Sequence, residues 1–134
     1  MAAHPSFVLV LASNRQACRC TASCLETFGY RVLVAQTGAD AAALLQQERR
    51  ISTLVTDADL GGEVDGLAVA VIARRLNPAT RVIYTSTRLH AIPAGRKVTG
   101  APSLRAPYQP NQIIGIIGEL RGRATDDQRE PRAA

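Results

Sequence analysis

Short apolar runs alternate along the chain with segments of helical periodicity, and the connections between them are brief. This alternation is typical of βαβ units, which build a parallel sheet. Residues 7–12 are apolar throughout, as in a strand that is buried on both faces, and they are predicted to form the central strand. The strands are predicted over residues 7–12, 31–35, 53–57, 81–85 and 103–106.

Helix signals fill the gaps between these strands. Ser13 or Asn14 can cap a first helix that runs to about residue 28, and Gly29 follows it as a C-terminal glycine. Residues 88–100 are too rich in proline and glycine for a full helix, so the fourth helix should be shortened or irregular. The other helices are expected over about residues 38–49, 66–76 and 110–120.

Length and composition predict one domain. The chain has 134 residues, of which 46% are hydrophobic, enough for a single core. We expect the domain over residues 1–121 and a polar, mobile tail over residues 122–134, where the only apolar residues are alanines. The chain begins without a charged leader and no apolar stretch approaches the roughly 18 residues that span a bilayer, so we expect a cytoplasmic protein without a membrane partner.

Charge and cysteine content argue against nucleic-acid binding and against a cysteine metal site. The net charge of +5 comes from arginines that are scattered along the chain, without the basic block or interleaved aromatic residues of a nucleic-acid platform. Cys18, Cys20 and Cys24 have no nearby histidine or fourth ligand, so we interpret them as small buried thiols and not as a metal site. The oligomeric state is left open.

Asp57 ends the third predicted strand, at the carboxyl edge where open α/β sheets bind their ligands. A Gly-Gly-x-x-Asp-Gly loop follows it, a Thr-Ser pair ends the fourth strand, and Pro107 follows the fifth. In this order the motifs resemble a response-regulator receiver domain, over about residues 7–120. The resemblance implies a flavodoxin-like (βα)5 fold, a doubly wound parallel sheet with strand order 2-1-3-4-5.

The resemblance assigns roles to several residues of this chain. Asp57 is the candidate phosphoacceptor and Ser86 the candidate switch hydroxyl. Asp59 occupies the position whose backbone carbonyl helps to hold Mg²⁺, so Asp57 and Asp59 are the candidate metal residues. Pro107 is a candidate for a cis peptide bond.

The sequence also departs from the family pattern. Ala12 and Ser13 stand where the family has two carboxylates, Ala106 where it has a lysine, and Ser103 where it has an aromatic switch residue. Lys97 lies too early in the chain to replace that lysine unless its loop folds back. Because phosphoryl transfer depends on charge neutralisation, we predict slow or absent phosphorylation, and either no cofactor or weakly bound Mg²⁺.

The acidic loop after Asp57 offers possible replacement ligands. Asp59, Glu63 and Asp65 do not follow the spacing of a calcium loop, which would require a glutamate where Ala68 stands. We therefore interpret the loop as a solvated acidic turn.

These observations favour a non-enzymatic, stand-alone receiver-like domain of phosphorelay signalling, degenerate and acting by protein–protein interaction. Its partner would be a histidine kinase, a phosphotransfer protein or an output protein, bound through about residues 88–120. One alternative is a conventional receiver phosphorylated on Asp57. A flavin- or nucleotide-binding protein of the same fold is disfavoured because residues 13–17 contain no glycine to cradle a phosphate.

Overall fold

The computed structural model describes the backbone of residues 6–133 and the side chains of residues 6–122. Strands and helices alternate along the chain, and each predicted strand is present. The elements are β1 (Phe7–Leu11), α1 (Arg15–Thr27), β2 (Arg31–Ala35), α2 (Gly38–Gln47), β3 (Ile51–Asp57), α3 (Gly66–Leu76), β4 (Arg81–Ser86), η1 (Leu89–Ala91), η2 (Ala94–Arg96), β5 (Ser103–Arg105) and α4 (Pro110–Ala133).

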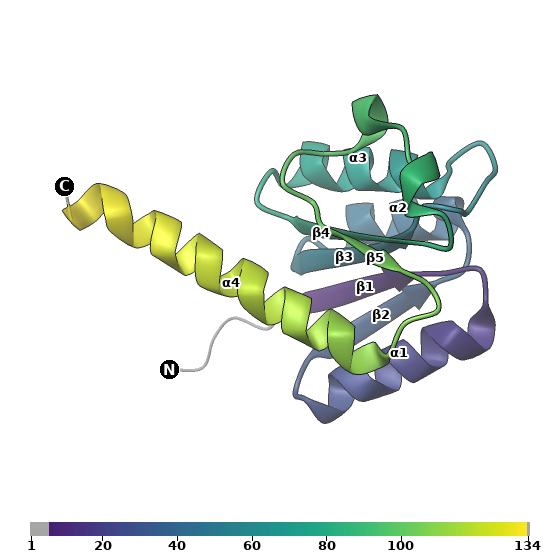
Figure 1. The fold of residues 1–134 in the computed structure, drawn as a ribbon, viewed down its shortest axis with the longest axis horizontal. Helices are drawn as coiled ribbons and strands as arrows, with labels where there is room; N and C mark the ends of the chain where they lie inside the picture. The colour runs from purple at the N-terminus through teal and green to yellow at the C-terminus, as the bar shows by residue number, and fades with distance from the viewer. Residues whose placement is uncertain (1–5, 134) are drawn as a thin grey trace.

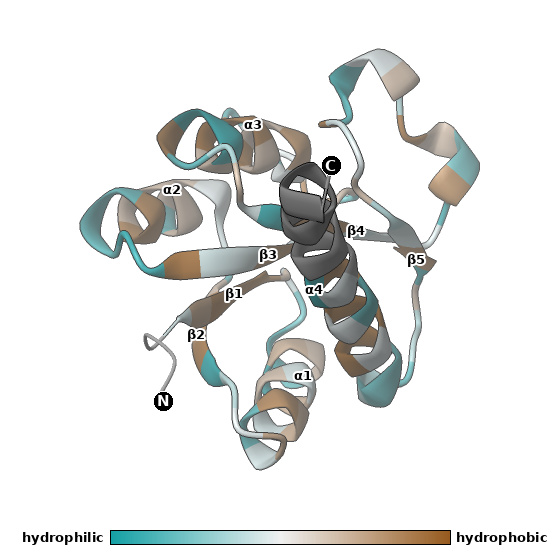
Figure 2. Ribbon diagram, turned by 90° about the vertical axis from the view of Figure 1, so that its left-hand side faces the viewer, coloured by the Kyte–Doolittle hydropathy of each residue, from teal (hydrophilic) through white to brown (hydrophobic). Residues whose placement is uncertain are grey.

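The strands form one parallel sheet in the order β2-β1-β3-β4-β5. The central position of β1 and the strand order are confirmed. Helices α2 and α3 cover one face of the sheet and α1 and α4 cover the other, as Figures 1 and 2 show. The chain therefore has the doubly wound flavodoxin-like architecture.

Alternate side chains of the central strands bury themselves on the two faces of the sheet. Leu9 and Leu54 pack under α2 and α3, whereas Val10 and Val55 face α1 and α4. Fully burying one such side chain contributes about 1.5–3 kcal/mol, so this double burial explains the continuous apolar runs. Figure 2 shows hydrophobic colouring on strands of the sheet, while the helices alternate between hydrophobic and hydrophilic colours.

The ends of α1 follow from its sequence. The side chain of Asn14 accepts a hydrogen bond from the backbone N–H of Ala17 at 2.9 Å and caps the first turn. Gly29 has a φ of 93°, which is a left-handed conformation that favours glycine, and it ends the helix. Both the cap and the terminating glycine agree with the sequence-based prediction.

The cysteines of α1 differ from their predicted environment. Cys18 is buried, but Cys24 is only half-buried and Cys20 is exposed. The buried residues of α1 are Cys18, Thr21 and Leu25, which recur at helical spacing on one stripe, and Cys20 lies off that stripe. The interpretation as buried thiols is thus wrong for Cys20.

Residues 88–100 form no α-helix but contain two short 3₁₀ turns, η1 and η2. This confirms the prediction of an irregular segment in place of a regular fourth helix. The backbone N–H of Val98 donates a 2.9 Å hydrogen bond to the hydroxyl of Tyr84, a fully buried residue of β4, and ties the segment to the sheet. The helix labelled α4 is therefore the fifth helix of the predicted pattern.

Helix α4 extends past the edge of the sheet in Figure 1 and includes most of the predicted tail, residues 122–134. Side chains after Gly122 lie outside the described residues, and the mobility of the tail stays a prediction. Ile113 and Ile117 of α4 are fully buried against the sheet. No helix in the described part of the chain is both long enough and apolar enough to cross a membrane.

Candidate functional site

Asp57 ends β3 and lies beside Thr85 of β4 in the sheet register. Its carbonyl accepts a 3.1 Å hydrogen bond from the backbone N–H of Leu60, so the chain turns immediately after the strand. The first residue of α3, Gly66, packs directly on this carbonyl and leaves no room for a side chain. The turn and the helix together fix the half-buried Asp57 side chain at the carboxyl edge of the sheet.

Asp57 lines a pocket of about 490 Å³ at this edge. The pocket is bounded by the β1–α1 connection, α1, the ends of β3 and β4, and the β5–α4 connection. The Ala106–Pro107 peptide bond, which forms part of its wall, is cis. The lining residues are Ala12, Asn14, Ala17, Cys20, Thr21, Asp57, Asp59, Thr85, Thr87, Ala106, Pro107, Tyr108 and Pro110.

The surroundings of Asp57 disfavour its ionised form. Burial raises the pKa of Asp57 above its ordinary value, and the negative charge of Asp59 raises it further, while hydrogen bonds from the backbone of Asp59 and Ser13 oppose these effects. The bond from Asp59 N to Asp57 Oδ1 is 2.9 Å long. No arginine or lysine is among the residues that line the pocket, so nothing cationic in this part of the structure compensates the carboxylate.

The Asp59 carboxylate binds the end of β4 and the residue that follows it. It accepts hydrogen bonds from Ser86 Oγ at 2.6 Å and from both the backbone N–H and the hydroxyl of Thr87 at 2.8 Å. We call these three residues the Asp59 clasp. Burial alone would raise the pKa of Asp59, but these hydrogen bonds hold it below its ordinary value. The clasp directs the hydroxyl proton of Ser86 to Asp59 and away from Asp57.

The clasp could not be predicted from the sequence. The resemblance gave Asp59 a role only through its backbone carbonyl and gave Ser86 a role toward Asp57. The contact joins residues that are far apart in sequence, and the loop conformation decides which oxygen Ser86 meets.

Lys97 does not replace the missing lysine. Its Nζ donates a 3.1 Å hydrogen bond to Ser103 Oγ and lies 5.7 Å from the centre of the Tyr84 ring. It is not among the residues that line the Asp57 pocket. Ala106 occupies the family position of the lysine, and the neighbouring Arg105 is exposed and does not line the pocket either.

Asp65 was interpreted as part of a solvated acidic turn, and the structure corrects this. Its side chain caps α3 by accepting the backbone N–H of Ala68 at 2.8 Å, and it binds both terminal nitrogens of Arg96 at 2.9 and 3.0 Å. The hydrogen bonds from Arg96 and the cap hold the pKa of Asp65 below its ordinary value against the effect of partial burial. An aspartate directly before a helical apolar stripe is an N-cap signal, so the cap was detectable in the sequence.

The donor set at this edge does not fit a resident Mg²⁺ ion. The residues that the structure describes include no group of three or more His, Cys, Asp or Glu side chains that could hold a metal. Mg²⁺ prefers several oxygen ligands in octahedral geometry, and here Ala12 and Ser13 stand where the family has two carboxylates. This leaves the carboxylate of Asp57 and the backbone carbonyl of Asp59 as the candidate ligands.

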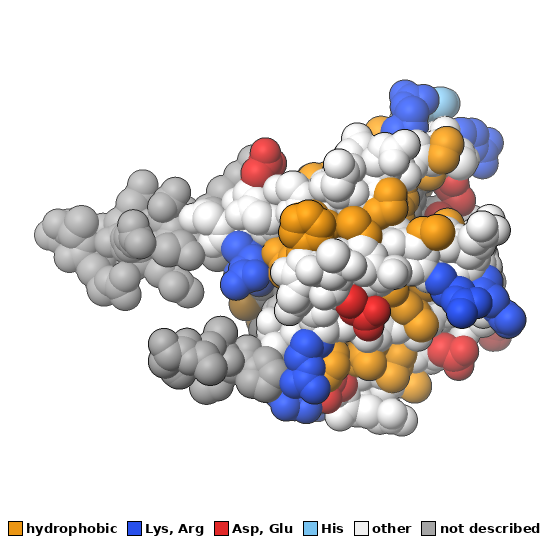
Figure 3. Space-filling view, turned by 90° about the horizontal axis from the view of Figure 1, so that it is seen from below, with side chains coloured by type: hydrophobic (Ala, Val, Ile, Leu, Met, Phe, Trp, Pro, Cys, Tyr) orange, Lys and Arg blue, Asp and Glu red, His pale blue; other side chains and the backbone are white. Residues whose placement is uncertain are grey.

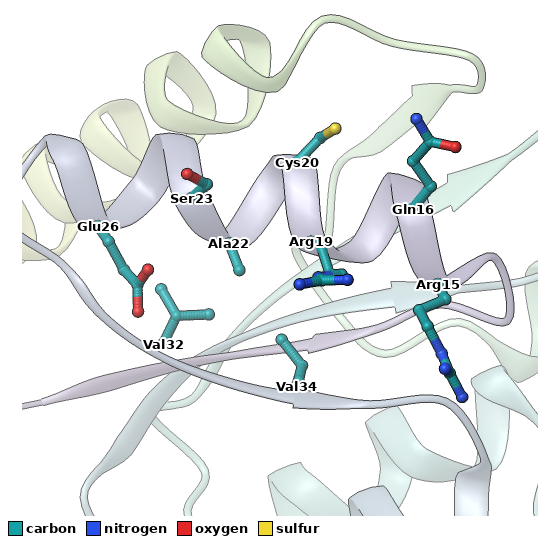
Figure 4. A pocket seen from close by; sticks show the side chains of 9 residues that line it. All are labelled: Arg15, Gln16, Arg19, Cys20, Ala22, Ser23, Glu26, Val32 and Val34. Carbon is teal, nitrogen blue, oxygen red and sulfur yellow. The ribbon is translucent and has the colours of Figure 1, made fainter.

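A second hollow of about 840 Å³ lies between α1 and β2. Figure 4 shows Arg15 and Glu26 at opposite ends of this groove and Arg19 between them, with Val32 and Val34 of β2 along its floor. The groove is larger than the Asp57 pocket but is open, and its charged groups do not converge on one point. The Asp57 pocket is therefore the better candidate site.

No protein-family model matches the sequence, and no curated protein matches it. Solved structures do match. A response regulator receiver protein from Sinorhizobium medicae WSM419 is 26% identical, with a TM-score of 0.77 over 86% of this chain and 93% of that protein. A CheY-like receiver domain from Methanospirillum hungatei JF-1 is 18% identical, with a TM-score of 0.77 over 92% of this chain and 99% of that domain.

A receiver domain from Clostridium thermocellum is 20% identical, with a TM-score of 0.75 over 90% of this chain and 97% of that domain. The chain therefore has the fold of a response-regulator receiver domain, and the resemblance read from the sequence is confirmed at this level. The similarity to the Sinorhizobium medicae protein supports a receiver role in two-component signalling.

Proposed function

We propose that this chain is a degenerate receiver-like domain that signals by binding a protein partner and does not depend on phosphorylation of Asp57. The observation that carries the proposal is the electrostatic isolation of Asp57. No basic side chain lines its pocket, and the candidate switch hydroxyl of Ser86 is engaged by Asp59.

Phosphorylation would convert the Asp57 carboxylate into a dianionic acyl phosphate, which would lie beside the remaining carboxylate of Asp59. Transfer of a phosphoryl group requires positive charge near its equatorial oxygens, since the protein contributes mainly positioning and charge stabilisation. The Asp57 pocket instead offers Ala12 and Ala106 at the positions of two of the missing charged groups. An aspartyl phosphate would therefore form slowly here, and we assign the domain no catalytic turnover.

The partner surface that we propose comprises about residues 88–120. Its exposed charged side chains are mostly basic, with Arg88 and Arg96 on the irregular segment and Arg105 on β5, whereas Glu119 is acidic. A partner with an acidic surface would complement this face, because opposite potentials favour encounter and register. A histidine kinase, a phosphotransfer protein or an output protein remains the expected class.

Nucleic acid is a weaker candidate partner. Figure 3 shows the face formed by α1 and α4, where basic side chains are separated by hydrophobic and acidic ones and do not gather into a stripe. A flavin or nucleotide is weaker still, because Asn14, at the start of α1, uses its side chain to cap that helix in place of a glycine-rich phosphate loop.

The decisive experiment is phosphorylation by a small phosphodonor. We expect intact mass spectrometry to show no added phosphoryl group on the wild type after incubation with acetyl phosphate and Mg²⁺. The matched gain-of-function variant combines Ala12→Asp with Ala106→Lys, which restores a metal ligand and a cation at the pocket. We expect this variant to be phosphorylated, and the addition of Asp57→Asn to abolish that gain.

Phosphorylation of the wild type that depends on both Asp57 and Mg²⁺ would overturn the proposal. It would favour the conventional receiver instead.

A further inference from the structure

The Asp57 pocket combines an apolar wall with the carboxylates of Asp57 and Asp59. Ala12, Ala17, Pro107 and Pro110 supply short or rigid apolar surface, and the volume of about 490 Å³ lies within the range of small-molecule sites. The alanines end at Cβ, so they leave open the space that longer side chains would fill. The pocket can therefore accept the body of a small organic ligand.

The polar groups of the pocket favour a ligand with a positive charge. Asp57 accepts a backbone hydrogen bond from Asp59, but no side chain among the described residues donates one to it. Asp59 adds a second negative charge, and the lining contains no basic residue. Anions are thus repelled, whereas an ammonium group would supply the hydrogen-bond donor and the positive charge that Asp57 lacks.

Tyr108 gives the pocket an aromatic wall. Its hydroxyl forms a 3.0 Å hydrogen bond with Thr21 Oγ1, which fixes the ring between α1 and the start of α4. An aromatic ring near a cation attracts it electrostatically in addition to offering apolar contact.

We infer that the Asp57 pocket is a binding site for a small organic ammonium ligand, whose cationic group pairs with the Asp57 carboxylate and whose apolar body lies against the alanine and proline wall. The inference goes beyond the proposed function, since it concerns a ligand and not a protein partner.

The test uses three probes of similar shape and different charge, namely benzylammonium, benzyl alcohol and benzoate. Amide chemical shifts of the ¹⁵N-labelled full chain are followed by NMR during titration. For a ligand of this size we expect a Kd on the order of 1 mM for benzylammonium. Its shifts should centre on Asp57, Thr87 and Tyr108, with binding of benzyl alcohol at least about tenfold weaker and no benzoate binding at this pocket.

The α1–β2 groove provides an internal control. It contains Arg15 and Arg19, so any benzoate shifts should appear there. Shifts from benzylammonium confined to that groove would overturn the inference. Equal affinity for the cation and the alcohol, or no shifts at the Asp57 pocket at 20-fold the expected Kd, would overturn it as well.

Two variants identify the groups responsible. Asp57→Asn keeps the shape of the side chain and should weaken benzylammonium binding at least about tenfold, while Asp40→Asn, the same charge change on α2, should not. Ala17→Leu should also weaken binding by filling the pocket from an exposed position of α1. Unchanged affinity in Asp57→Asn refutes the assigned cation contact.

Mg²⁺ distinguishes an organic from an inorganic cation site. Displacement of benzylammonium by millimolar Mg²⁺ would show that the pocket takes metal ions and would overturn the inference. These results are separate from the mass measurement, because a wild type that is phosphorylated and still binds benzylammonium would contradict only the proposed function.

Discussion

Replacing Asp59 by alanine tests whether the Asp59 clasp holds the end of β4. The substitution removes the acceptor of three hydrogen bonds, from Ser86 Oγ, Thr87 N and Thr87 Oγ1. Hydrogen bonds to a charged group contribute about 1.5–3 kcal/mol each in favourable buried cases. Asp59 is exposed, so water replaces part of each bond, and we expect a total loss of about 1–2 kcal/mol in the free energy of unfolding.

The pH dependence of this loss has a definite sign. The folded-state pKa of Asp59 is depressed, so its stabilisation is present above the ordinary aspartate pKa of about 3.9. It is lost as the pH falls through the lower, folded-state value. The difference between wild type and Asp59→Ala should therefore be nearly constant near neutral pH and shrink in acid.

Urea denaturation measures the free energy of unfolding of wild type and Asp59→Ala, and amide hydrogen exchange shows which residues are destabilised. We expect faster exchange at Thr87 N, whose amide loses its acceptor, with little change in the buried strands. Glu63→Ala is the matched control, because it removes the same charge from an exposed position in the same loop. A loss below about 0.3 kcal/mol, or an equal loss in the control, would refute the reasoning that the clasp stabilises this edge.

Three further outcomes follow from the structure. Asp57→Asn should stabilise the protein near neutral pH, because burial raises the pKa of Asp57 and folding therefore opposes its ionisation. The gain, measured by urea denaturation, should disappear as the pH falls below the ordinary aspartate pKa of about 3.9, and a loss of stability at neutral pH would contradict the desolvation argument. Gly66→Ala should cost about 2–3 kcal/mol since its Cβ would collide with the Asp57 carbonyl, whereas Gly61→Ala, with no atom within 4 Å, should be nearly neutral in thermal unfolding. Ile117→Ala should cost about 3 kcal/mol by leaving a cavity under α4, and a chemical denaturation midpoint equal to that of the wild type would contradict its burial.

The fold was predictable because its signals are local. Strand β2 begins and ends at the residues predicted from its apolar run, and the Asn14 cap and Gly29 terminator bracket α1. A parallel sheet buried on both faces requires continuous apolar strands, and few soluble architectures produce five of them alternating with helices. The strand order 2-1-3-4-5 was then implied by the resemblance to receiver domains.

The position of the candidate site was predictable from the sequence, but the side-chain hydrogen bonds around it were not. The apolar run that ends at Asp57 placed this residue at the sheet edge, and the resemblance to receiver domains identified Ala12 and Ala106 as positions that lack the family's charged groups. It did not show that Asp59 binds Ser86 or that Asp65 binds Arg96, because these pairs join loops whose paths no local pattern specifies. Hydrogen bonds across long sequence separations depend on loop conformation, which propensity and periodicity do not encode.

The double attachment of Asp65 has a mechanical consequence for docking on the irregular segment. A binder that pulls η2 outward would separate Arg96 from Asp65 and leave that carboxylate with its hydrogen bonds from the backbone of Leu67 and Ala68 in the first turn of α3. That turn rests through Gly66 on the carbonyl of Asp57. A protein bound at η2 would in this way be connected to Asp57 through Arg96, Asp65 and Gly66, without a phosphoryl group.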